Sequence, residues 1–169
     1  TLGIFVNSGG RVNSYFAQLC VSKLEICDFN YLPDPIYFFR VLIREQPDIV
    51  AEYIPKYIEF SIMKFNEEIS GNYYYETIAN ISSSLLDICT SSSLSSLIDI
   101  SQLVQLVISK LPVKGDYREG TFIYNTLLLI AQKYPRAIIQ SIPNLFVGII
   151  KTLSFKDATF NKYEFPKQT

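Results

Sequence analysis

Ile54-Pro55-Lys56-Tyr57-Ile58-Glu59-Phe60-Ser61-Ile62 is the stretch that decides the fold, and a similar one follows at Ile142-Pro143-Asn144-Leu145-Phe146-Val147-Gly148-Ile149-Ile150. In both, an aliphatic residue and a proline open an amphipathic run. Proline is tolerated in the first turn of a helix because its missing N–H would have no partner there. The two prolines are 88 residues apart, which is two units of 44. The spacing predicts a repeated helix with a fixed start.

A third copy of this pattern lies between the first two. It is Leu103-Val104-Gln105-Leu106-Val107-Ile108, with Gln105 in the proline position, at spacings of 50 and 38 residues. A unit of about 44 residues is the length of a HEAT or armadillo repeat. We therefore expect an all-α fold, an α-solenoid of stacked antiparallel helix pairs (HEAT repeats). Residues 1–169 would form a single fragment of a longer array, with 156–169 a loose tail or truncated repeat.

Hydrophobic periodicity places the individual helices. Apolar residues recur at three- and four-residue steps, and no stretch shows the sustained alternation of a strand. Asp34 and Pro35 are expected as the N-cap and first residue of one helix. One continuous core is expected to hold Ile81, Leu85, Leu106, Leu127 and Phe146, with Leu128 also available to it. The predicted helices are 11–27, 35–46, 48–65, 72–90, 98–111, 117–134 and 143–155, and Pro55 either kinks the third or begins its main body.

Composition and charge exclude several classes of function. The chain is 49% hydrophobic, but no segment approaches the roughly 18 apolar residues of a membrane span, so no membrane partner is expected. Residues 25–99 carry 12 acids and four bases, whereas residues 110–169 carry nine bases and four acids. Nucleic acid requires a basic face, so it is not an expected partner. The acidic stretch suits a basic protein, unless these charges only keep helix faces solvated.

Few residues offer catalytic chemistry. The chain has no histidine, and no nucleotide-binding or hydrolase motif occurs. Glu67-Glu68 is an obvious carboxylate pair, but adjacent carboxylates in a polar loop are typical of a solvated turn. Cys20, Cys27 and Cys89 lack metal spacing and are expected to be small buried residues in a reducing compartment. We expect no catalytic residues, no metal and no cofactor.

Two polar features have both a structural and a functional interpretation. Asn80 interrupts an apolar helix face, and it would either bond the backbone of the neighbouring helix pair or hydrogen-bond the backbone of an extended peptide. Tyr73-Tyr74-Tyr75 resembles a stacking platform for single-stranded nucleic acid, but residues 66–79 contain no lysine or arginine. The tyrosines are better interpreted as filling the seam between helix pairs.

Three further runs carry a resemblance to a known family. They are Glu76–Ile88, Gln102–Asp116 and Tyr124–Pro135, followed by Ile142-Pro143-Asn144-Leu145. Their order and spacing resemble the C-terminal HEAT repeats of the importin-β (karyopherin-β) receptors, and most of all the importin-β3 type. The resemblance covers residues 72–155. It departs from the family at Asp87, where the family has lysine, and at Lys110, where it has tryptophan.

The resemblance implies a nuclear transport receptor that wraps basic protein cargo on a concave face. It also implies that the full-length protein binds Ran GTPase and Phe-Gly nucleoporins and moves between cytoplasm and nucleus. The expected cargo-binding residues are Glu52, Glu59, Asn80, Asp99 and Gln102, acting by binding and release alone. A HEAT scaffold of another kind, such as a phosphatase regulatory subunit or a coat adaptor, would share the same helices.

Overall fold

The computed structural model describes residue 6 and residues 9–27, 31–67, 71–114 and 117–154. Every regular element in these ranges is helical, which confirms the all-α prediction for the described part of the chain. The elements are α2 (Ser14–Ile26), α3 (Pro33–Glu45), α4 (Pro47–Val50), η2 (Ala51–Tyr53), α5 (Ile54–Asn66), α6 (Asn72–Thr90), η3 (Ser95–Leu97), α7 (Ile100–Ser109), α8 (Tyr117–Lys133), α9 (Pro135–Ile139) and α10 (Ile142–Ser154). The predicted tail 156–169 lies outside the described residues.

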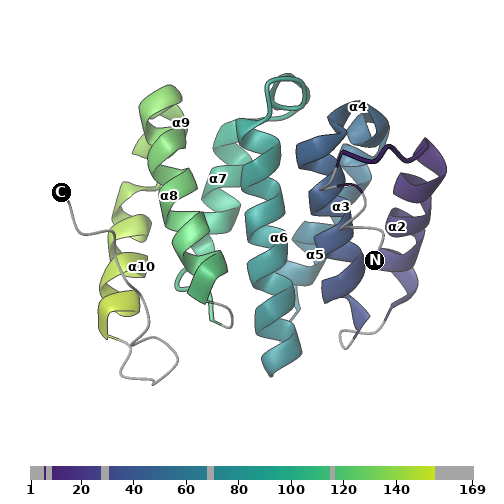
Figure 1. The fold of residues 1–169 in the computed structure, drawn as a ribbon. Helices are drawn as coiled ribbons and strands as arrows, with labels where there is room; N and C mark the ends of the chain where they lie inside the picture. Colours follow the sequence, from purple (N-terminus) through teal and green to yellow (C-terminus); the bar gives the residue numbers. More distant parts are fainter. Residues whose placement is uncertain (1–5, 7–8, 28–30, 68–70, 115–116, 155–169) are drawn as a thin grey trace.

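The helices are arranged as a row. Figure 1 shows α2, α3, α6 and α8 side by side, with α2 at one end and α10 at the other. Along this row α3 packs against both α2 and α6, and α6 packs in turn against α8. Helix α5 contacts α2 and α6, while α7 contacts α6, α9 and α10. Consecutive long helices therefore lie beside one another, with a second set of helices packed against the row.

Prolines set several of the helix starts. Helix α3 begins at Pro33, so the expected N-cap at Asp34 is wrong: Leu32 is the N-cap, and its carbonyl accepts the N–H of Ile36 at 3.2 Å. Pro33 and Pro35 both fit the first turn because the first four N–H groups of a helix have no intrahelical partner. Likewise Pro55 lies in the first turn of α5, after a separate short helix and a 3₁₀ turn.

The core follows the predicted apolar faces with two exceptions. Ile81, Leu85 and Leu127 are fully buried, and Leu106 is partly buried against them. Phe146 and Leu128, which were expected inside, are each 60% exposed. Phe146 lies on α10, at the end of the row, where no described helix covers its side. Periodicity identified the apolar face of α10 but not what lies opposite it.

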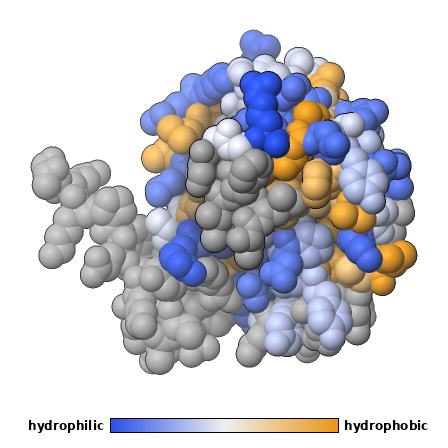
Figure 2. Space-filling model, turned by 45° about the vertical axis from the view of Figure 1, so that its right-hand side comes forward, coloured by the Kyte–Doolittle hydropathy of each residue, from blue (hydrophilic) through white to orange (hydrophobic). Residues whose placement is uncertain are grey.

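The surface at the α2 end is mixed. Figure 2 brings this end forward and shows apolar side chains scattered among polar ones. On α2 itself, Tyr15 and Ile26 are exposed. In the described part of the chain, no helix has both the length and the apolar character needed to cross a membrane.

Gly148 allows α10 to approach the connection between α7 and α8. A Cβ atom at this position would lie 2.7 Å from the Cβ of Leu111, closer than real Cβ atoms come to other heavy atoms. Leu111 follows α7 and packs against the core. The glycine is therefore required by packing, and not by backbone conformation, because α10 is a regular helix here.

Leu85→Ala and Phe146→Ala should differ strongly in their effect on stability. Leu85 is fully buried, so its truncation should lower the free energy of unfolding by about 2–5 kcal/mol. Phe146 is mostly exposed, so its truncation to alanine should lower the free energy of unfolding by less than about 1 kcal/mol. Urea unfolding followed by circular dichroism measures both values. Equal losses for the two variants would contradict the burial described here.

Gly148→Ala should destabilise the protein by about 1–3 kcal/mol, because the added methyl group overpacks against Leu111. Val147→Ala on the same helix is the control, since Val147 is exposed and the change should stay within about 0.5 kcal/mol. Thermal melts of the two variants provide the comparison. If the Gly148→Ala variant melts at the same temperature as the parent or higher, α10 does not approach Leu111 closely.

Candidate functional site

The five predicted cargo-binding residues lie on different elements. Glu52 in η2, Glu59 in α5 and Gln102 in α7 are exposed. Asp99 is also exposed and precedes α7, whereas Asn80 is buried in α6. Asp99 and Asn80 line two different hollows. The prediction that all five act on one cargo stays a prediction.

Asp99 has a local structural role that sequence reasoning missed. Its Oδ1 accepts the backbone N–H of Ser101 at 2.9 Å and that of Gln102 at 3.2 Å, so Asp99 is the N-cap of α7. The signal was present, because aspartate before an apolar helical run is a preferred N-cap. The hollow beside it has a volume of about 710 Å³ and is also lined by Lys133 and Arg136. These two bases offset the carboxylate, which makes this hollow a poor site for a basic partner.

Asn80 lines a polar pocket between three helices. The pocket has a volume of about 430 Å³, and its walls come from the start of α3, the first half of α6 and the start of α8. Its lining residues are Pro33, Asp34, Tyr37, Glu76, Ala79, Asn80, Arg118 and Glu119. Three carboxylates and one guanidinium therefore surround the pocket. The sequence prediction identified Asn80 but not its acidic neighbours.

Asn80 is buried, with an exposed fraction of 7%, and one hydrogen bond orients its side-chain amide. Its Nδ2 donates to the backbone oxygen of Glu76 at 3.1 Å, within the same helix. One of the two Nδ2 hydrogens is thus used within α6, and the amide can offer a ligand its carbonyl oxygen as an acceptor. The structural interpretation placed the partner of Asn80 in a neighbouring helix pair, but the described bond lies within α6 itself.

A buried ionic cluster adjoins the pocket and shares Glu119 with it. Arg40 in α3 donates from Nε to Oδ2 of Asp87 in α6 at 2.7 Å. Its Nη1 donates to both carboxylate oxygens of Glu119 in α8, at 2.8 and 2.7 Å. The hydroxyl of Ser83 also donates to Glu119, and the guanidinium lies 4.4 Å from the ring centroid of Phe122. One arginine therefore joins three consecutive helices of the row.

The electrostatics of this cluster are set by burial and by mutual pairing. Burial raises the pKa of Asp87, and the hydrogen bond and positive charge of Arg40 oppose that rise only in part. Burial alone would lower the pKa of Arg40, but its bonds to Asp87 and Glu119 raise it. The guanidinium stays charged at every physiological pH. Burying the Asp87 carboxylate costs free energy, and the ion pair with Arg40 offsets that cost.

The other candidate groups of the sequence have structural partners or low reactivity. Glu67 pairs with Lys64 at 2.8 Å, and Glu68 lies outside the described residues. The Lys114 ammonium lies 5.0 Å from the ring centroid of Tyr75, and Tyr73 is exposed.

Cys20 and Cys89 are buried as expected, and burial raises the pKa of each thiol to about 12. Cys27 is only partly buried. No group of three or more His, Cys, Asp or Glu side chains in the described ranges could hold a metal ion.

Arg40→Met should lower the free energy of unfolding by about 3–5 kcal/mol at pH 7, because it leaves Asp87 and Glu119 buried without a counter-charge. Without Arg40, the pKa of Asp87 should rise further above its unfolded value. A carboxyl group with a raised folded pKa favours the folded state at low pH and opposes it at high pH. The loss should therefore shrink as the pH falls toward about 4.

Arg136→Met is the matched control, since Arg136 is exposed on α9 and is not among the charges that act on Asp87. It should change stability by no more than about 0.5 kcal/mol. Urea titrations of both variants between about pH 7 and pH 4 measure the effect. A loss for Arg40→Met that is the same at both pH values would contradict the charge-based account of the cluster.

Comparison with known proteins adds no assignment. No protein-family model, curated protein or solved structure matches this chain. The resemblance to importin-β receptors therefore rests on the residues quoted for it.

Proposed function

We propose that this chain is a protein-binding segment of an α-solenoid, built from stacked antiparallel helix pairs, that captures basic protein segments by reversible binding. The observation that carries the proposal is the Asn80 pocket, where a buried amide and the Asp34, Glu76 and Glu119 carboxylates come from three different helices. The row of side-by-side helices in Figure 1 supports the solenoid architecture.

The pocket suits the side chain of a lysine or arginine in an extended partner. A lysine ammonium has three donors and no acceptor, and the pocket offers the Asn80 carbonyl oxygen and carboxylates as acceptors. Arg118 and Arg40 partly offset the carboxylates, since Arg40 already pairs with Glu119. Asp34 and Glu76 are the exposed carboxylates of the lining. They would therefore provide most of the attraction for a cationic side chain.

The specific form that we propose is a nuclear transport receptor of the importin-β type. The resemblance of residues 72–155 favours it, and the acidic balance of residues 25–99 is consistent with basic cargo. On this proposal the full-length protein binds Ran GTPase and Phe-Gly nucleoporins and works in the cytoplasm and the nucleus. Its mechanism is binding and release, with no covalent step. Glu52, Glu59 and Gln102 would extend the contact to residues of the cargo beyond the pocket, whereas Asp99, which shares its hollow with Lys133 and Arg136, would add little to it.

Asp34→Asn combined with Glu76→Gln should weaken binding of a Lys-rich import-signal peptide by roughly tenfold, because each exposed ion pair contributes about 0.2–1 kcal/mol. Glu45→Gln with Asp48→Asn is the matched control: it removes the same two charge types from exposed positions away from the pocket. Fluorescence anisotropy of the labelled peptide measures both dissociation constants. Equal weakening by the two pairs would reduce the effect to net charge and would contradict the pocket assignment.

A second set of variants tests the residues on the other helices. Glu52→Gln, Glu59→Gln and Asp99→Ser remove three charges, and serine keeps an N-cap on α7. If this triple variant weakens peptide binding more than the pocket pair does, the cargo lies on that surface instead.

A separate experiment tests the family: binding of RanGTP by the full-length protein separates a transport receptor from a HEAT scaffold of another kind. Absence of RanGTP binding would remove the transport-receptor form and leave the peptide result to stand on its own.

A further inference from the structure

The Asn80 pocket contains an aromatic ring as well as carboxylates. Its lining includes Tyr37, which lies on α3 together with Asp34, while Glu76 comes from α6. Tyr37 is 49% exposed, and among the described residues no other ring stacks on it and no cation lies over it. Cations are attracted to the face of an aromatic ring. The Tyr37 ring is therefore available to a cationic side chain that enters the pocket.

The pocket also contains a buried acceptor that has no partner. Asn80 is 7% exposed, and its Nδ2 donates to the backbone oxygen of Glu76. Its Oδ1 has no hydrogen-bond partner within the part of the chain that the structure describes. A buried acceptor without a donor is costly, and a ligand with N–H groups removes that cost. Asn80 thus points to a ligand with several N–H donors, independently of the acidic residues.

The molecule already holds one guanidinium between the same three helices. Arg40 on α3 donates to Asp87 on α6 and to Glu119 on α8, and it lies 4.4 Å from the ring centroid of Phe122. Two carboxylates and one aromatic ring therefore surround it. The Asn80 pocket lines its hollow with the same kinds of group, namely the Asp34 and Glu76 carboxylates and the Tyr37 ring.

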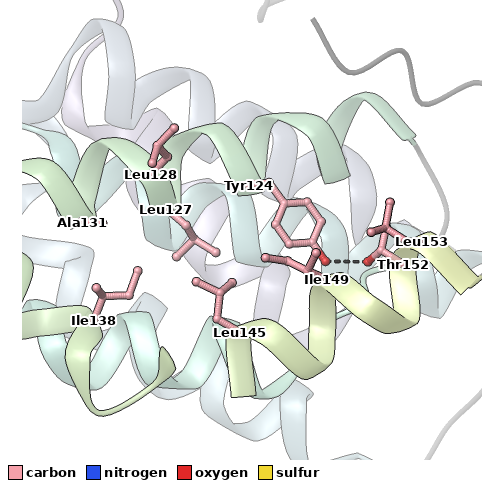
Figure 3. Close-up of a pocket in the computed structure, with 9 residues that line it drawn as sticks. All are labelled: Tyr124, Leu127, Leu128, Ala131, Ile138, Leu145, Ile149, Thr152 and Leu153. Atoms are coloured by element: carbon pink, nitrogen blue, oxygen red, sulfur yellow. Dashed lines mark hydrogen bonds between the residues drawn. The ribbon is translucent and has the colours of Figure 1, made fainter. Parts of the chain in front are cut away.

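The hollow between α8 and α10 shows that this combination is particular to the Asn80 pocket. Figure 3 shows its lining, which is apolar except for Tyr124 and Thr152 and contains no carboxylate. The two hydroxyl groups lie 2.6 Å apart, and Thr152 donates to the backbone oxygen of Gly148. Although this hollow has an aromatic residue, it offers a cation no counter-charge.

These groups distinguish arginine from lysine. A guanidinium is planar and weakly hydrated, it stacks on aromatic rings, and its five donors can reach several acceptors at once. A lysine ammonium is compact and strongly hydrated, and its three donors lie on a single nitrogen. Arg118 also lines the pocket, but its charge opposes both side chains alike. The ring and the dispersed acceptors therefore favour arginine.

We infer that the Asn80 pocket prefers arginine to lysine and that Tyr37 sets this preference. The guanidinium stacks on the Tyr37 ring and donates to Asp34, Glu76 and Oδ1 of Asn80, whereas lysine is held more weakly by the carboxylates alone. This inference rests on the proposed binding of basic segments, because it names the residue of the segment that the pocket selects.

The test uses the full chain and two labelled extended peptides that differ only in having arginine or lysine at every basic position. In fluorescence anisotropy at a fixed salt concentration, the arginine peptide should bind at least roughly fivefold more tightly to the parent. Tyr37→Leu should reduce this ratio to less than about twofold, since the ring is lost, whereas Tyr37→Phe should keep it. Tyr15→Leu is the matched control, because Tyr15 is exposed on α2 outside the pocket, and it should also keep the ratio.

Two results would overturn the inference. One is equal affinity of the parent for both peptides, or a preference for arginine that persists in Tyr37→Leu and in Tyr37→Gln. The other is tighter binding of a trimethyl-lysine peptide, which has the charge but no N–H donors, because the ring alone would then select the ligand. Circular dichroism confirms that each variant is folded.

The variant pair Asp34→Asn with Glu76→Gln separates this inference from the proposed function. If the pair weakens both peptides but the parent binds them equally, the pocket takes basic segments and only the preference for arginine is wrong. If the pair binds both peptides as tightly as the parent does, the pocket assignment itself is wrong and the inference is wrong with it.

Discussion

The Arg40 guanidinium is the interaction on which the arrangement of α3, α6 and α8 depends. It pairs with Asp87 on one neighbouring helix and with Glu119 on the next, while its plane lies over Phe122. Taking these charges out of water is costly, so the cluster adds little net stability compared with well-packed apolar residues. Its consequence is specificity: a shift of one helix along another would leave a buried charge without its partner. The cluster therefore fixes the register of three helices.

That register also builds the polar pocket. Glu119 belongs to both the cluster and the pocket lining, and Asn80 lies one turn before Ser83, which donates to Glu119. A change in the position of α8 relative to α3 would separate Arg118 and Glu119 from Asp34. The site proposed for basic segments is thus a product of packing between helices, and it does not exist on any single one. The row holds rigid helices in place, and the starts of α3 and α8 and the first half of α6 supply the functional groups.

Sequence periodicity was sufficient for the helices and insufficient for the contacts between them. The predicted range 72–90 coincides with α6 because Gly71 precedes it and the apolar spacing is regular throughout. Arg40 had a signal that was overlooked, since it interrupts Phe38-Phe39-Arg40-Val41-Leu42-Ile43 on a helix with few polar residues. Its partners could not be named, because Asp87 and Glu119 lie 47 and 79 residues away. The prediction that Phe146 is buried was wrong for the opposite reason. Its apolar helix face was identified correctly, but nothing in the local sequence says whether another helix covers that face.

The central claim is that basic partners are recognised where the starts of α3 and α8 meet the first half of α6. An NMR titration of the ¹⁵N-labelled chain with a Lys-rich peptide tests it directly, because backbone amide shifts locate the contact without altering any residue. The account predicts that the largest shifts fall on Asp34, Glu76 and Asn80 and their immediate neighbours, with saturation at one peptide per chain. Largest shifts on Glu52, Glu59 and Gln102, or weak shifts spread over all acidic residues, would contradict it.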